Sequence, residues 1–202
     1  MSKVSKKELI VEKAKDSFSK YGYELTTIEA IAKECNITKP AVYYHFKDKA
    51  TLYKAVVCPE FTALAEKIEE HTKKGIPTQR LENYIQTFGE FLIQNPTFSA
   101  IFAREIANGS ATLPDDCTEQ LSRTIRQLIS ILHTGEKEKV FQVESPFLIQ
   151  MMIVTPLISC QTTKPLREKI AQFAHNEIIP LEPHFGNIVD SLSQKIIKGL
   201  LC

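Results

Sequence analysis

Helical periodicity is the feature of this chain that most restricts its fold. Apolar residues recur every third or fourth position along almost the whole sequence, as at Ile10, Ala14 and Phe18. No alternating apolar–polar stretch is long enough for a half-buried strand. A spacing of four residues places side chains on one face of an α-helix. With 202 residues, 43% of them hydrophobic, the chain can bury a substantial core. The sequence therefore predicts an all-α protein.

Two short helices joined by a tight turn are predicted between residues 26 and 46. The first helix of the chain is expected to end near Gly22. Thr26 then stands as the N-cap of the next helix, with Glu29 completing a capping box. The buried face of that helix is predicted to hold Ile28, Ile31 and Ala32. Asn36 tolerates the left-handed conformation, so it is expected to turn the chain.

The second of these helices is predicted to begin after Thr38 as its cap. Pro40 falls in its first turn, where the missing backbone N–H has no intrahelical acceptor to lose. Val42 and Phe46 lie four residues apart and can face the core. The residues left at or near the outer surface are Lys39, Ala41, Tyr43, Tyr44 and His45. This layout is that of a helix-turn-helix.

The exposed set has the chemistry of a DNA-reading surface. Alanine can contact a thymine methyl group, while tyrosine and histidine can bond phosphates or base edges. Lys39, Lys47 and Lys49 add charge, and residues 1–50 carry ten lysines against seven acidic residues, a balance of +3. The alternative is that the aromatic side chains only close one end of a small helical bundle.

The stretch GYELTTIEAIAKECNITKPAVYYHFKDKATLYKAVV resembles the N-terminal DNA-binding domain of the tetracycline repressor (TetR) family, and the likeness covers the first 57 residues. Asn36 and Pro40 stand where that family commonly has glycine. The resemblance implies an N-terminal three-helix DNA-binding domain over residues 1–50. It also implies a larger helical domain for effector binding and dimerisation over residues 51–202.

The resemblance also implies roles for individual residues. Those that would contact DNA are Thr27, Lys39, Pro40, Ala41, Tyr43, Tyr44, His45 and Lys49. Thr27 and Lys49 would bind phosphates, and Tyr44 and His45 would hold the DNA backbone. The residues that would face the major groove are Lys39, Ala41 and Tyr43. The implied protein is a cytoplasmic homodimer without a cofactor. It would bind double-stranded DNA at an inverted repeat, as a repressor released by a small-molecule effector.

Beyond residue 57 the sequence predicts helices at 78–94, 97–106, 115–133, 145–160, 166–178 and 187–201. A long helix from Asp48 to Gly75 contains Pro59, which predicts either a kink or a break into two helices. The uncharged run at 145–163 is too short for a membrane span, so it is expected to be buried in a core or between subunits. Side chains that could line an apolar effector pocket are Phe88, Phe91, Phe102, Phe147 and Met151. Ordinary core packing is the alternative for them.

No catalytic constellation is found, so an enzyme is not predicted. Ser17 to Lys20 matches S-x-x-K without a companion motif. His175, Glu182 and His184 lack helical spacing, and no metal site is predicted. The five cysteines are scattered singly, which does not predict a disulfide framework, and no signal peptide is visible. Two other hypotheses stay open: a DNA-binding regulator that responds to cysteine oxidation, and a small helical enzyme or carrier.

Overall fold

The computed structural model describes residues 5–174 and 184–202, which form ten helices. The helices are α1 (Lys6–Leu25), α2 (Ile28–Glu34), α3 (Lys39–His45), α4 (Lys49–His71), α5 (Pro77–Gln94), α6 (Pro96–Ala107), α7 (Asp115–Lys137), α8 (Pro146–Thr162), α9 (Lys164–Ala174) and α10 (Phe185–Leu200). The described residues contain no strand, only an isolated bridge between Phe141 and Leu201. The all-α prediction is confirmed.

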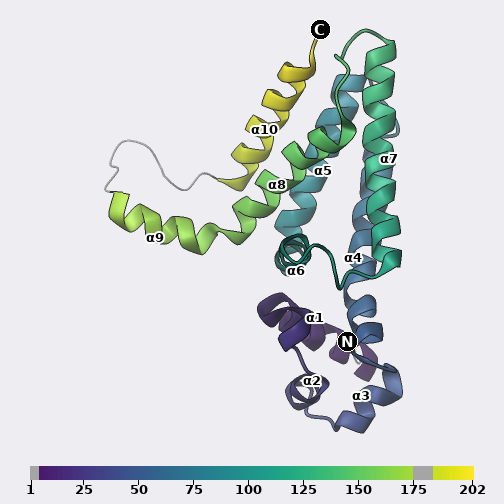
Figure 1. Cartoon of the computed structure of the whole chain (residues 1–202), viewed down its shortest axis with the longest axis vertical. Helices are drawn as coiled ribbons and strands as arrows, with labels where there is room; N and C mark the ends of the chain where they lie inside the picture. Colours follow the sequence, from purple (N-terminus) through teal and green to yellow (C-terminus); the bar gives the residue numbers. More distant parts are fainter. Residues whose placement is uncertain (1–4, 175–183) are drawn as a thin grey trace.

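The helices form a small N-terminal bundle and a larger helical body joined by α4 (Figure 1). Helices α1, α2 and α3 make up the bundle at one end of the molecule, and α4 rises from it into the body. There α4 packs against α5 and α7, while α10 and α8 pack against α5. Helix α6 contacts both α1 and α8, so it lies where the bundle meets the body.

Helix α4 is continuous through Pro59, so the predicted break into two helices is wrong. Eight buried side chains hold this helix in the core, from Leu52 near its start to Ile68 near its end. Proline removes one helical hydrogen bond, but burial on this scale stabilises the helix by more than that loss. The boundary expected after residue 50 falls in the first turn of α4, because this helix packs on both α1 and α7.

Helix α8 is less covered than its composition predicts. Its buried side chains, Ile149, Ile153, Val154, Leu157 and Ile158, face the body. Phe147, Leu148, Met151 and Met152 are exposed, so within one chain this uncharged helix is not buried on most sides. No helix in the described part of the chain combines the length and apolar character needed to cross a membrane.

Candidate DNA interface and effector pocket

The start of α2 lies one residue later than predicted. Thr27 is the N-cap, and its Oγ1 accepts a hydrogen bond from the Ala30 N–H at 3.2 Å. Thr26 is buried, and its hydroxyl donates to the Gly22 carbonyl at 2.7 Å. Gly22 leaves helical geometry with φ +80°, which exposes a carbonyl that the Thr26 hydroxyl satisfies. The predicted capping box is absent because the N3 position of a helix capped by Thr27 is Ala30, and the Glu29 carboxylate pairs with Lys39.

The turn and the start of α3 follow the predicted chemistry. Asn36 has φ +53° and turns the chain between the helices. Thr38 is the N-cap, accepting from the Ala41 N–H at 3.4 Å, and Pro40 lies in the first turn. Val42 and Phe46 are buried as expected. Helix α3 is therefore held by its cap and by these two anchors, and its outer face is set by their position.

That outer face presents most of the residues expected to contact DNA. Lys39, Pro40, Tyr43 and Tyr44 are exposed, while Ala41 and His45 are half-buried. Tyr44 is 86% exposed, and its ring meets the His45 ring edge to face at 5.1 Å between centroids. An aromatic side chain this exposed gains little from its own fold, which favours a binding role.

Lys39 is linked across the turn to Glu29 of α2. Their hydrogen bond lowers the pKa of Glu29 and raises the pKa of Lys39, so both groups are charged at neutral pH. Both side chains are largely exposed, so the pair contributes little to stability. A DNA phosphate approaching α3 would compete with Glu29 for the Lys39 ammonium.

Lys49 makes hydrogen bonds within the protein that would compete with its predicted phosphate contact. Its Nζ donates to the carbonyls of Tyr23 at 2.9 Å, Glu24 at 3.3 Å and Thr26 at 3.2 Å. The ammonium also lies 4.3 Å from the Tyr23 ring centroid. An ammonium has three donors, and here all three are used. Lys49 therefore joins the end of α1 to the start of α4.

Lys47 and Lys49 make a matched pair for testing this assignment. Lys47 is exposed in the turn after α3. The Lys47→Ala variant is expected to lower the salt-dependence slope of DNA binding by about one unit, because one phosphate contact is lost. Lys49→Ala is expected to leave that slope unchanged and to lower the melting temperature, because α1 loses its link to α4. Binding titrations over a range of salt concentrations and thermal unfolding of each variant provide the measurements. A lower slope for Lys49→Ala together with an unchanged slope for Lys47→Ala would contradict the assignment.

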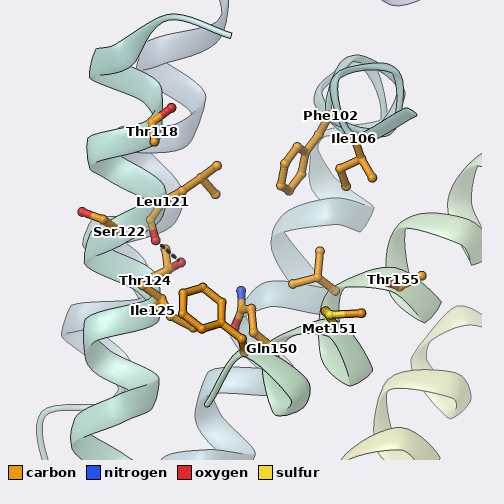
Figure 2. Close-up of a pocket in the computed structure, with 12 residues that line it drawn as sticks. Phe102, Ile106, Thr118, Leu121, Ser122, Thr124, Ile125, Gln150, Met151 and Thr155 are labelled. Atoms are coloured by element: carbon orange, nitrogen blue, oxygen red, sulfur yellow. Dashed lines mark hydrogen bonds between the residues drawn. The ribbon is translucent and has the colours of Figure 1, made fainter. Parts of the chain in front are cut away.

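A pocket of about 490 Å³ lies between α6, α7 and α8 (Figure 2). Its lining residues are Phe102, Ile106, Thr118, Leu121, Ser122, Thr124, Ile125, Phe147, Gln150, Met151, Val154 and Thr155. Three of the five predicted pocket residues, Phe102, Phe147 and Met151, are in this lining. Phe88 and Phe91 do not line it. They pack in the core, where Phe88 is fully buried and the Phe91 ring meets the Phe98 ring of α6 edge to face.

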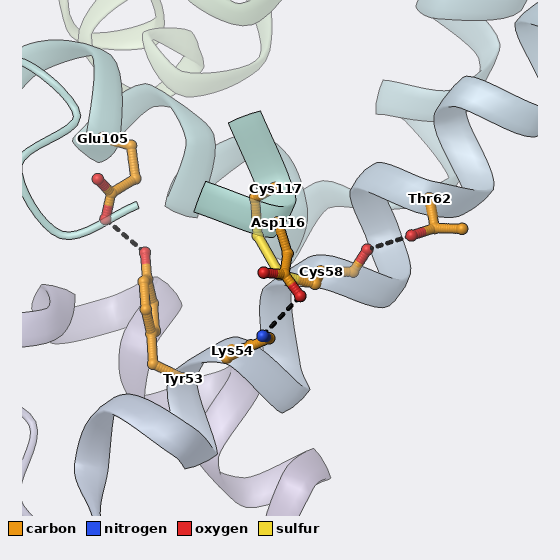
Figure 3. The surroundings of a disulfide bond; sticks show 7 residues. All are labelled: Tyr53, Lys54, Cys58, Thr62, Glu105, Asp116 and Cys117. Carbon is orange, nitrogen blue, oxygen red and sulfur yellow. Dashed lines mark hydrogen bonds and ion pairs between the residues drawn. A yellow bond between two sulfur atoms is a disulfide. The ribbon is translucent and has the colours of Figure 1, made fainter. Parts of the chain in front are cut away.

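Helix α6 connects this pocket to the N-terminal bundle. Phe102 and Ile106 line the pocket, whereas the side chains of Arg104 and Glu105 reach other helices. Arg104 donates to the carbonyls of Ser19 and Lys20 on α1, at 3.2 and 2.8 Å. Glu105 accepts a hydrogen bond from the Tyr53 hydroxyl of α4 at 2.5 Å (Figure 3). One short helix thus touches both the pocket and the bundle.

Glu105 is a buried carboxylate with incomplete hydrogen bonding. It is 3% exposed, and its Oε1 accepts from Tyr53 and, at 2.5 Å, from the Thr112 hydroxyl. Its Oε2 is buried with no hydrogen-bond partner. Burial, followed by the bond to Glu105, raises the pKa of Tyr53, so the phenol remains a donor. Such a carboxylate costs stability, and its place between two helices points to a functional role.

Cys58 of α4 and Cys117 of α7 form a disulfide, which the scattered cysteines of the sequence did not predict (Figure 3). Their Cα atoms are 5.1 Å apart, although 59 positions separate them in sequence. Beside them Lys54 pairs with Asp116 at 2.5 Å, so a covalent bond and an ion pair join α4 to the first turn of α7. Cys35 is buried, and burial raises the pKa of its thiol.

Within the described residues no group of three metal-binding side chains occurs. Of the three residues considered for a metal, His184 caps α10, and its Nδ1 accepts from the Gly186 N–H at 3.3 Å. His175 and Glu182 lie outside the described residues.

Comparison with known families agrees with this arrangement of a bundle and a body. The family model described as "Bacterial regulatory proteins, tetR family" matches residues 10–56. The family model described as "YcdC-like protein, C-terminal region" matches residues 60–156. The chain belongs to the TetR family of bacterial transcriptional regulators. The predicted family and its helix-turn-helix are thereby confirmed.

Relatives of this TetR-family chain match either its whole length or its N-terminal part. The transcriptional regulator RutR of Escherichia coli K12 is 23% identical over 205 residues, which span 97% of this chain and 91% of RutR. The biofilm operon negative regulator IcaR of Staphylococcus aureus strain Newman is 43% identical over 51 residues, 25% of this chain and 27% of IcaR. The crystal structure of HlyIIR, a haemolysin II transcriptional regulator, superposes with a TM-score of 0.65 at 27% identity, covering 98% of this chain and 97% of HlyIIR.

Sequence reasoning missed the contacts through which α6 of this TetR-family protein reaches the bundle. Glu105 follows Phe98, Ile101 and Phe102 at helical spacing, so a carboxylate falls on the apolar face of its helix. A charged residue on an apolar helix face is the sequence signal that could have identified Glu105. Arg104 and the Cys58–Cys117 bond leave no comparable signal, because their partners are distant in sequence.

Proposed function

We propose that this TetR-family protein is a cytoplasmic, dimeric repressor that a small-molecule effector releases from an inverted-repeat operator. Helix α3 of each subunit would enter a major groove, with Tyr43 and Lys39 toward the bases and Tyr44 and His45 on the DNA backbone. The effector would occupy the pocket between α6, α7 and α8. The proposal assigns no catalytic activity to the chain.

The contacts of α6 carry this proposal. An occupant touching Phe102 and Ile106 presses on the helix that also holds Arg104 against α1 and Glu105 against Tyr53. A ligand can shift an equilibrium only through different contacts in its two states. Movement of α6 would change the position of the bundle relative to α4 and so the separation of the two α3 helices in a dimer. Coupling between two sites of this kind amounts to about 1–3 kcal/mol.

The direct test of the function is an electrophoretic shift assay with the DNA that flanks the protein's own gene. A shifted complex that unrelated DNA cannot displace, and that weakens steeply with salt, is the expected result. Equal competition by unrelated DNA at all salt concentrations would contradict operator recognition.

The exposed face of α8 supports the dimer. Leu148 and Met152 are 46% and 43% exposed, although nothing on this helix is charged. Two copies of α8, with α10 beside each, would bury that face in a four-helix interface. In this arrangement the stripe Val189, Ile196 and Leu200 stays against the body, where it is buried in the single chain.

Placing a charge on the α8 face is expected to separate the subunits. The Leu148→Glu/Met152→Glu variant should be a monomer in light scattering at micromolar concentration, because each dimer would bury four unpaired carboxylates. Ile76→Glu is the control, since Ile76 is 66% exposed in the turn before α5, away from α8. If the double variant is still a dimer, the interface does not include this face of α8.

The Cys58–Cys117 bond favours a second candidate function, control of DNA binding by oxidation. A reducing compartment keeps most protein thiols reduced, so a disulfide there is commonly a regulated one. The bond joins α4, which reaches the bundle, to α7 one residue before Thr118 of the pocket. Its formation removes two thiol protons and two electrons, which a low-molecular-mass disulfide or a hydroperoxide would accept.

Operator affinity with and without dithiothreitol tests this second function. The oxidised wild type is expected to change affinity on reduction, and the Cys58→Ser/Cys117→Ser variant is expected to match the reduced wild type under both conditions. Cys202→Ser is the control, because Cys202 is exposed and outside the bond. Equal affinities of oxidised and reduced wild type would reject redox control.

A further inference from the structure

The pocket between α6, α7 and α8 has a lining without formal charge. Its twelve residues include no Asp, Glu, Lys, Arg or His. An ion that enters such a site gives up its hydration and gains no counter-ion, which strongly disfavours its binding. With a volume of about 490 Å³ the pocket lies in the range of small-molecule sites. Its composition therefore selects against carboxylates, phosphates and ammonium groups.

The Gln150 side chain in the lining is held in a fixed orientation by a buried residue outside the lining, Tyr84. Tyr84 of α5 is fully buried, and its hydroxyl donates to the Gln150 Oε1 of α8 at 2.7 Å. Burial raises the pKa of Tyr84, which keeps the phenol protonated as a donor. The Gln150 carbonyl oxygen is thus occupied, and its amide nitrogen, with two N–H donors, is the end left for the pocket. Figure 2 shows this nitrogen pointing into the space between α7 and α6.

Two of the three hydroxyl groups that α7 brings to the lining, those of Ser122 and Thr124, are used by their own helix. Thr124 donates to the Leu121 carbonyl at 2.8 Å, and Ser122 donates to the Glu119 carbonyl at 2.7 Å. Serine and threonine commonly satisfy their donors in this way on helices. Among the polar groups of the lining, the Gln150 amide is the donor whose orientation is fixed by a buried side chain behind it.

We propose that the effector is an uncharged, mainly apolar molecule with an oxygen acceptor, such as a ketone or ester carbonyl, that accepts a hydrogen bond from Gln150 Nε2. Tyr84 acts as a positioning residue for Gln150. The inference rests on the proposed function and specifies the class of its ligand. It excludes from this pocket both acyl compounds with a free carboxylate and acyl groups attached to a phosphorylated carrier.

Matched probes test the charge requirement. Three straight-chain compounds of equal length, a methyl ketone, a carboxylate and a primary ammonium, are titrated into the full-length protein by calorimetry. The ketone is expected to bind at least about tenfold more tightly than either ion, because only the ions lose hydration without compensation. Equal or tighter binding of the carboxylate or the ammonium would overturn the inference.

Variants of Gln150 test the hydrogen bond. Gln150→Leu is expected to weaken ketone binding about tenfold and to leave binding of the alkane of equal length unchanged. The Tyr84→Phe/Gln150→Leu variant removes both partners, so no buried hydroxyl is left unpaired, and it should fold and show the same selective loss. Gln161→Leu, on the same helix but outside this pocket, is the control. An unchanged ketone affinity in both Gln150 variants would overturn the role of Gln150.

Two further outcomes separate this inference from the proposed function. Operator release by the carboxylate probe but not by the ketone would overturn the ligand class and leave the repressor function standing. Selective ketone binding by a protein that binds no operator would do the reverse. In a third outcome no probe binds, and the melting temperature changes with protein concentration but not with added probe. A second subunit then covers the exposed side chains of Phe147 and Met151, and the inference fails.

Discussion

Tyr53→Phe and Glu105→Leu are each expected to lower the free energy of unfolding by about 2–3 kcal/mol, while the double variant loses much less than the sum. Each single change leaves a buried polar group without its partner. Tyr53→Phe removes one of the two donors to a carboxylate whose Oε2 already lacks one, and Glu105→Leu strands the phenol and the Thr112 hydroxyl. Replacing both partners with apolar side chains removes the part of that penalty that arises from the Tyr53–Glu105 bond, and only the Thr112 hydroxyl is left without its partner. Urea unfolding of the four proteins in the cycle provides the measurement.

The same cycle distinguishes a structural role for the pair from a signalling role. If the bond couples α6 to α4, the double variant recovers stability but not the wild-type change in operator affinity on effector binding. Thr112→Val is the matched control, because it removes a hydrogen bond from the same Oε1 without touching α4. A double variant that responds to the effector as the wild type does would show that the pair only supports the fold.

Gly135→Ala is expected to lower the free energy of unfolding by about 3 kcal/mol, near the top of the range for overpacked cores. A Cβ at this position would lie 2.1 Å from the Cδ2 atom of Phe141. Phe141 is 2% exposed, and the backbone around it bonds the end of the chain, with Gln142 N–H donating to the Leu200 carbonyl at 2.8 Å. The ring cannot move without disturbing the attachment of α10.

A second glycine provides the control for that prediction. Gly199 also lies in a helix, but a Cβ added there would meet no atom within 4 Å. Gly199→Ala is therefore expected to stabilise the protein by up to about 1 kcal/mol through helix propensity alone. Adding Phe141→Leu to Gly135→Ala should recover part of the loss, since the smaller side chain makes room for the methyl group. Calorimetric unfolding showing simple additivity would contradict a clash with Phe141.

The helices and the helix-turn-helix could be predicted from the amino-acid sequence, because the interactions that form them act within a few residues. Asn36 supplies the left-handed turn, Thr38 caps α3, and Pro40 occupies a first-turn position that needs no N–H donor. The spacing of Val42 and Phe46 then decides which side chains of α3 face outward. All of these effects depend on local backbone geometry, so they can be predicted without knowing which helices pack against one another.

What those helices contact depends on how they pack together, and the sequence did not predict it. Whether Thr26 or Thr27 capped α2 depended on the Gly22 carbonyl, and the role of Lys49 depended on the end of α1. Phe88 and Phe91 resemble Phe102 in sequence, yet both are buried away from the pocket, whereas Phe102 lines it. The Tyr53–Glu105, Tyr84–Gln150 and Cys58–Cys117 pairs join residues 52 to 66 positions apart. Such partners are chosen by how helices pack, and helical periodicity specifies which face is buried but not which helix covers it.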